Sequence, residues 1–251
     1  MILTPARTTS VVEISRVEVD GRPVPVPVTL TSADEGGEGR PGIILFPEIF
    51  GINEFILDTA CDLARRGFIV ATPNLYHRSG TDPMPHEDVR RAMKMALTIT
   101  PETSEIDTDA AIALLRSHPD VADDRLAVMG YCVGGLLSYA AVARRPGVFR
   151  ASVVFYANGL MGTSPHRAWH NDLLRELPPA DAPVRMFYGG QDDHISTDYV
   201  KTVDAQLEAF GVDVETVLYE EAGHGFCNSR LPTFNAGAAQ DAWLTAMNFL
   251  A

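Results

Sequence analysis

The sequence lacks any apolar run near the about 18 residues that a helix needs to cross a bilayer. Residues 1–7 also lack the charged start and apolar core of a signal peptide. The chain has three cysteines, Cys61, Cys132 and Cys227, an odd and sparse set that argues against a disulfide framework and for a reducing compartment. These absences predict a cytoplasmic protein.

Positive charge is also scarce, because 20 Lys and Arg residues stand against 33 Asp and Glu residues, for a net charge of -13. An acidic surface repels the phosphates of nucleic acids and the headgroups of anionic membranes. We therefore expect neither as a partner. A monomer and a homodimer both remain open.

Metal-ligand spacing is missing too. No cysteine pair has C-x-x-C spacing, and the histidines outside the motifs below form no metal pattern: His77, His86, His118, His166 and His170. We expect no metal and no cofactor.

Short apolar segments and amphipathic segments alternate from residue 42 to the end. The predicted strands are two within residues 11–30, then 43–46, 68–71, 126–129, 151–155, 184–188 and 214–219. The predicted helices are 53–66, 89–97, one that begins at Ser104, then 134–144, 169–177, 199–210 and 236–250. This alternation predicts an α/β fold with a mostly parallel central sheet of about eight strands and helices on both faces. We expect a single domain over residues 1–251, with residues 1–20 as an N-terminal extension or edge strand.

The most informative motif is at residues 130–135, which read GYCVGG after the apolar run at 126–129. A strand, a G-x-nucleophile-x-G turn and a helix are the layout of a nucleophile elbow. Gly130 and Gly134 are expected where a Cβ would collide with neighbouring backbone. The motif presents Cys132 as a nucleophile, although a tight turn with a buried thiol would also fit it.

A cysteine nucleophile needs a base, and the base needs an orienting acid. Candidates follow in the order that this architecture uses, each after a predicted strand. Asp192 or Asp193 is the acid, and His224, between two glycines, is the base. Alone each motif is weak, but in this order they predict a Cys-His-Asp site at the carboxyl ends of the strands.

With these motifs, the chain from about residue 20 onward resembles the dienelactone hydrolases of the α/β-hydrolase fold. The segments that carry the resemblance are PEIFGIN at 47–53, PNLY at 73–76, GYCVGG at 130–135, GGQDDHI at 189–195 and AGHGF at 222–226. The resemblance implies that Cys132 is the nucleophile, His224 the base and Asp192 the acid.

Acyl transfer also needs two N–H donors for the oxyanion. We expect them from Val133, after the nucleophile, and from Ile49, in the loop after the strand at 43–46. In the similar family a glutamate at the place of Glu48 contacts the resting thiol and helps to activate it. The alternative is a structural carboxylate that bonds loop amides.

Members of the family that act on dienelactone hold the substrate carboxylate with arginines, one of them shortly after the catalytic histidine. Arg230 is the first arginine after His224, at a different offset, and Arg78, Arg90 and Arg91 are candidates for a second anchor. Pocket-lining candidates are Tyr76, Phe50, Trp169 and Tyr156, for which core packing is the alternative.

The sequence therefore predicts a hydrolase that cleaves a small ester or lactone through an acyl-cysteine intermediate. One alternative is a broad carboxylesterase or thioesterase on the same scaffold. The other is a non-catalytic protein that keeps the fold for binding or for redox sensing through Cys132.

Overall fold

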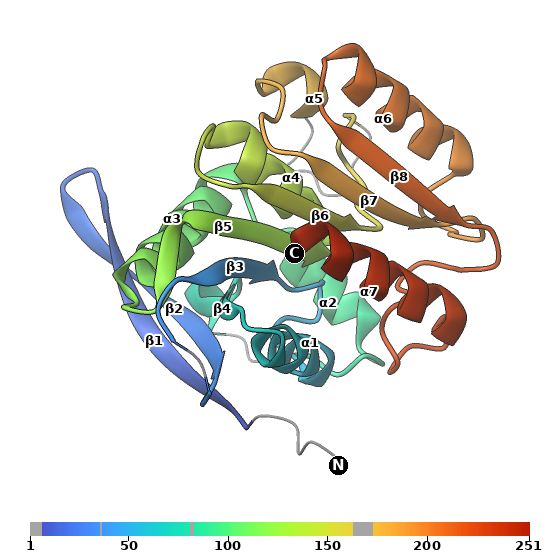
Figure 1. Cartoon of the computed structure of the whole chain (residues 1–251). Coiled ribbons are helices and arrows are strands. Elements are labelled where there is room, and N and C mark those ends of the chain that lie inside the picture. Colours follow the sequence, from blue (N-terminus) through green and yellow to red (C-terminus); the bar gives the residue numbers. More distant parts are fainter. Residues whose placement is uncertain (1–6, 36, 81–82, 163–172) are drawn as a thin grey trace.

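The computed structural model describes residues 7–35, 37–80, 83–162 and 173–251. Eight strands form one sheet in the order β1-β2-β4-β3-β5-β6-β7-β8 (Figure 1). They are β1 (Thr8–Val19), β2 (Arg22–Ala33), β3 (Arg40–Phe46), β4 (Ile69–Pro73), β5 (Val121–Tyr131), β6 (Ala151–Phe155), β7 (Val184–Gly189) and β8 (Val214–Tyr219). The pairs from β4 to β8 are parallel, whereas β2 joins β1 and β4 in antiparallel fashion. The predicted sheet is confirmed.

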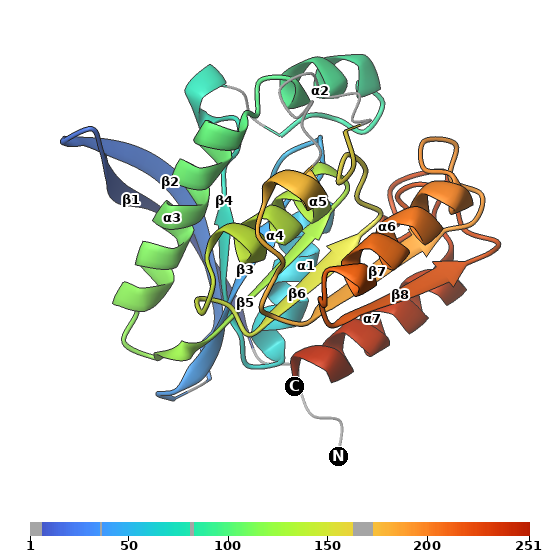
Figure 2. The same ribbon diagram turned by 90° about the horizontal axis from the view of Figure 1, so that it is seen from above.

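Helices cover both faces of this sheet (Figure 2). The longer ones are α1 (Glu54–Arg65), α2 (Val89–Ala96), α3 (Pro101–Ser117), α4 (Val133–Arg144), α6 (Thr197–Ala209) and α7 (Ala236–Leu250). Two short ones are η1 (His77–Ser79) and α5 (Leu173–Glu176). Helices α1 and α7 lie on one face, and α3, α4 and α6 lie on the other (Figures 1 and 2). Within the described residues, no helix combines the length and apolar character needed to span a membrane.

The core follows from the central parallel strands, which are covered on both faces and are therefore apolar throughout. Ile43, Ile44 and Leu45 of β3 are fully buried, as are Val153 and Val154 of β6. Because the strands are parallel, the loops after β3, β5, β7 and β8 gather at one edge of the sheet. All the predicted catalytic residues lie in these loops.

The N-terminal hairpin supplies the predicted edge strand. Asp20 and Gly21 join β1 to β2 with φ angles of 50° and 72°, both left-handed, which is the geometry of a tight two-residue hairpin turn. Among the described strands, β1 pairs with β2 alone.

The predicted start of the third helix was wrong. Helix α3 begins at Pro101, and the Thr100 side chain caps it by accepting a hydrogen bond from the Thr103 amide. The pair Ser104 and Asp107 imitates a helix start in sequence, but both residues lie inside the helix. For the helix predicted at 169–177, α5 covers only its C-terminal part, while residues 169–172, with Trp169, lie outside the described residues.

Candidate active site

Cys132 occupies a strained turn between β5 and α4, with φ of 56° and ψ of -117°. Such a conformation is rare for a residue with a side chain. The turn fits because its neighbours are glycines. A Cβ on Gly130 would lie 2.0 Å from the Gly134 carbonyl oxygen, and one on Gly134 would lie 2.4 Å from the carbonyl oxygen of Phe46. The predicted role of the two glycines is confirmed.

His224 stands between the thiol and a carboxylate. Its Nε2 atom lies 3.3 Å from Cys132 Sγ, and its Nδ1 atom lies 2.7 Å from Asp192 Oδ2. The other oxygen of Asp192 accepts hydrogen bonds from the amides of His194, at 2.7 Å, and Ile195, at 3.0 Å. These contacts fix the carboxylate, so that Nδ1–H of His224 is the donor to Asp192 and Nε2 faces the sulfur. Asp193 is exposed at the surface.

The pKa of His224 is raised to about 10. Burial lowers the pKa of the imidazole, but it is outweighed by the negative charge on Cys132, the hydrogen bonds to Asp192 and Cys132, and the Asp192 charge. The arrangement therefore favours the protonated form of His224. Tyr156, which has a φ of 38°, supports the ring from the side at 5.2 Å between ring centroids.

The loop after β3 lies against the elbow because Gly134 packs under the carbonyl groups of Phe46 and Pro47. The backbone N–H groups of Ile49 and Val133 both lie in this region. In the described part of the chain, neither of them donates a hydrogen bond to a protein group. The Ile49 carbonyl oxygen accepts a 2.8 Å hydrogen bond from the Tyr76 hydroxyl, which restrains the peptide on its other side. Tyr76 is thus a buried support of this loop, and burial raises the pKa of its phenol.

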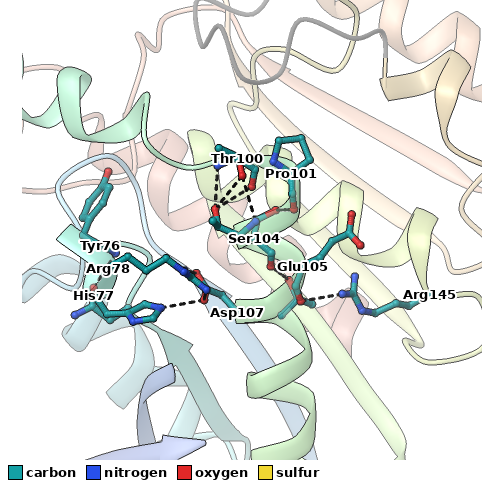
Figure 3. A network of polar contacts seen from close by, with 12 residues as sticks. Tyr76, His77, Arg78, Thr100, Pro101, Ser104, Glu105, Asp107 and Arg145 are labelled. Atoms are coloured by element: carbon teal, nitrogen blue, oxygen red, sulfur yellow. Dashed lines mark hydrogen bonds and ion pairs between the residues drawn. The ribbon is translucent and has the colours of Figure 1, made fainter. Parts of the chain in front are cut away.

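Arg78 does not point to the thiol but to helix α3. Its guanidinium forms an ion pair with both oxygens of Asp107, at 2.9 and 3.0 Å, and His77 Nε2 lies 3.3 Å from the same carboxylate (Figure 3). Asp107 is 1% exposed, so this ion pair is shielded on one side from water. The network ties η1, which follows Tyr76, to α3. The structure therefore gives Arg78 a buried ion-pair partner on α3, and its contact with substrate stays a prediction.

The remaining predicted substrate residues have the following surroundings, and their contact with substrate stays a prediction. Arg230 pairs with Glu54 and, at 3.6 Å, with Asp58 of α1. Arg90 is exposed on α2, as is Arg91. Phe50 is buried and packs its ring edge on His86 at 4.8 Å between centroids.

Glu48 is buried in a polar cluster with Asn53, His86 and Asn228. Its Oε1 atom accepts hydrogen bonds from the side-chain amides of Asn53, at 3.2 Å, and Asn228, at 2.7 Å, and lies 3.5 Å from His86 Nε2. Within the described residues no hydrogen bond joins Glu48 to Cys132. Sequence reasoning gave no role to these three partners. Only Asn53 has a local signal in the sequence, because it precedes a predicted helix that it can cap. His86 and Asn228 come from loops that are distant in the sequence.

Cys227 is a second free thiol, three residues after His224. It lines a cavity of about 310 Å³ between α1 and α7, together with Phe55, Tyr131 and Trp243. Burial, and then the charge of Glu48, raise the pKa of its thiol. As for metals, the residues that the structure describes include no group of three or more His, Cys, Asp or Glu side chains suited to an ion.

Comparison with known proteins points to one family. The profile of the dienelactone hydrolase family matches residues 29–251. A carboxymethylenebutenolidase of Pseudomonas putida is 31% identical over 219 residues, which cover 84% of this chain and 85% of that protein. A probable 2-oxo-3-(5-oxofuran-2-ylidene)propanoate lactonase of a Bradyrhizobium species is 30% identical, over 84% of this chain and 83% of its own.

Comparison with solved structures gives the same family. The crystal structure of a Klebsiella pneumoniae protein assigned to the dienelactone hydrolases superimposes with a TM-score of 0.81 at 25% identity. The match covers 96% of this chain and 98% of that protein. The predicted α/β-hydrolase fold is confirmed.

Proposed function

The chain belongs to the dienelactone hydrolase family and is a hydrolase of ester or lactone bonds, and from that premise we propose that Cys132, His224 and Asp192 form its catalytic triad. The observation that carries the proposal is the position of His224, with one ring nitrogen on Cys132 Sγ and the other on Asp192. This is the arrangement in which a base activates a nucleophile and an acid orients the base.

In the first step, the Cys132 thiolate attacks the carbonyl carbon of a small ester or lactone and forms a C–S bond. The charge moves to the carbonyl oxygen, where the amides of Ile49 and Val133 would stabilise it. Collapse of this intermediate breaks the C–O bond, and the His224 imidazolium gives its proton to the leaving alkoxide. An acyl-cysteine and a neutral imidazole remain.

In the second step, water attacks the acyl-cysteine carbonyl. Neutral His224 takes a proton from that water, and the thiolate leaves, so that the acid is released and the imidazolium–thiolate pair is restored. In a lactone the leaving alkoxide stays tethered to the acyl group. If it leaves while His224 keeps its proton, this alkoxide can itself take the proton of the attacking water. Every proton in the cycle is held by a side chain of this chain, by water or by the substrate.

A Cys132→Ala variant tests the proposal, assayed with p-nitrophenyl acetate and with dienelactone. We expect kcat to fall by about 10⁴-fold or more, while far-UV circular dichroism stays unchanged. A Cys227→Ala variant is the matched control, since that thiol lines the cavity behind the site. Retained turnover in Cys132→Ala overturns the nucleophile assignment, and failure of the wild type on every ester favours the non-catalytic alternative.

A broad carboxylesterase or thioesterase is the second candidate. It is favoured by the pairing of Arg78 with Asp107 and of Arg230 with Glu54, because these arginines were the predicted anchors of an anionic substrate. A panel that compares neutral esters and thioesters with anionic lactones distinguishes the two.

A further inference from the structure

Four side chains from separate segments form a buried cluster beside the candidate site, here called the Glu48 cluster: Glu48, Asn53, His86 and Asn228. Glu48 follows β3 and precedes Ile49, and Asn53 is the N-cap of α1. Asn228 lies four residues after His224, and His86 lies in the loop before α2. The cluster therefore joins the loop of the proposed oxyanion donor to the loop of the proposed base.

The orientation of both amides is fixed by the backbone. Asn53 Oδ1 accepts a hydrogen bond from the Ile56 amide at 3.1 Å, and Asn228 Oδ1 accepts one from the Arg230 amide at 2.9 Å. The oxygen ends are thus assigned, and both Nδ2 groups point to the interior of the cluster. An amide nitrogen has only hydrogens to offer, so each Nδ2 group is a donor.

These two donors determine the protonation state of His86. Each Nδ2 atom lies 3.1 Å from His86 Nε2, in addition to its bond with Glu48. Two donors can share Nε2 only if that nitrogen carries a lone pair, which requires a neutral ring with its proton on Nδ1. A proton on Nε2 would point at the hydrogens of the two amide groups and repel them. It would also draw the ring toward Glu48, whose Oε1 atom is 3.5 Å away.

The surroundings of His86 restrict how it responds to a proton. Within the described residues, Glu48 is the one titratable group in contact with the ring, and Phe50 packs against it with an edge. The amides cannot turn to present oxygen without losing their backbone hydrogen bonds, and for Asn53 that bond is the N-cap of α1. Protonation must therefore move the ring or Glu48.

We propose that neutral His86 is a positioning residue, which holds the Asn53 and Asn228 amides on Glu48, and that its protonation releases this arrangement and lowers activity. The proposal rests on the proposed function for its effect on turnover. Glu48 is bonded in sequence to Ile49, and Asn228 belongs to the loop of His224. Release of the cluster thus shifts both the oxyanion loop and the base loop, although His86 touches neither Cys132 nor the triad partners.

His86→Gln and His86→Ala test the role of the ring. A glutamine oxygen accepts from both amides but does not titrate, so His86→Gln should keep kcat/KM within about threefold at pH 8, while His86→Ala loses about tenfold. The ratio of kcat/KM for His86→Gln to that for the wild type should rise as the pH is lowered from 8 to 5, because only the wild-type ring can gain a proton. His118→Gln is the control, since His118 accepts from the Asp120 amide in a distant loop.

A ratio that stays constant with pH overturns the proposal. An equal loss of kcat/KM in His86→Gln and His86→Ala also overturns the proposal, because that result is expected if the ring only fills space. A second measurement needs no catalysis: the 15N spectrum of His86 in the wild type should show a bare Nε2 and a protonated Nδ1 at pH 8. A protonated Nε2 there overturns the proposal whether or not Cys132 is the nucleophile.

Discussion

The Nε2 atom of His224 lies 3.3 Å from the Sγ atom of Cys132, although 92 residues separate them in sequence. At this distance the charge on the sulfur is the strongest of the influences that raise the pKa of the imidazole to about 10, above its ordinary value near 6.5 and against the lowering by burial. Protonation of the imidazole is therefore coupled to the charge on the sulfur.

Alkylation of Cys132 should lower the pKa of His224 by removing the negative partner. We expect an imidazole that is protonated up to about pH 10 in the free protein and titrates lower after treatment with iodoacetamide. NMR titration of the His224 ring measures both values, and His118 is the internal control. An unchanged His224 titration would contradict the thiolate–imidazolium pair.

The raised pKa of His224 also affects the stability of the fold. A group whose pKa is higher in the folded state than in the unfolded state stabilises the fold below the unfolded pKa, and that contribution is lost as pH rises through the folded pKa. The difference in free energy of unfolding between the wild type and His224→Gln should thus decrease as the pH increases from about 7 toward about 10. Urea unfolding at several pH values measures it.

Asp192→Asn should lower kcat by about 10³–10⁴ with little change in KM. The asparagine oxygen can still accept from the amides of His194 and Ile195, but its NH2 group then opposes Nδ1–H of His224. The ring changes tautomer and turns an N–H toward the sulfur, which prevents it from taking a proton. Steady-state kinetics measures the loss, with the exposed Asp193→Asn as control, and a small effect of Asp192→Asn would reject the orienting role.

Gly134→Ala should destabilise the fold by about 3 kcal/mol, because the new Cβ would lie 2.4 Å from the Phe46 carbonyl oxygen and 2.6 Å from that of Pro47. Both contacts are with backbone, which cannot rotate away. Thermal unfolding should show a decrease of about 6–12 °C in Tm. Gly37→Ala is the control, since a Cβ there has nothing within 4 Å, and an equal Tm for the two variants would contradict the packing.

Arg78→Gln should lower the free energy of unfolding by about 2 kcal/mol, because among the described residues it leaves His77 as the one side-chain partner of the buried Asp107 carboxylate. This figure is discounted for the partial exposure of the Arg78 side chain. KM values for neutral and anionic esters should change by the same factor. A selective increase in KM for the anionic ester, without loss of stability, would instead identify Arg78 as the substrate anchor. Arg90→Gln, exposed on α2, is the control.

Local sequence patterns predicted most of the fold, because the strands and helices carry their own signals. The apolar run before Gly130, the hairpin turn at Asp20 and Gly21, and the helix after Cys132 all depend on neighbours within a few residues. The same reasoning failed at Ser104, where a local capping pattern was present but Thr100 and Pro101 begin the helix instead. The single domain, the compartment and the absence of nucleic-acid and membrane partners stay predictions.

The sequence by itself determined the chemical types at the site and their order along the chain. A G-x-C-x-G turn and the strand-following Asp192 and His224 are local features, and the parallel sheet brings its loops to one edge. Only the tertiary structure decided what each remaining polar group contacts. Arg78 faces Asp107, Arg230 faces Glu54, and Glu48 faces Asn53, Asn228 and His86. These partners come from distant segments, and no spacing in one segment encodes which buried charge a distant side chain will satisfy.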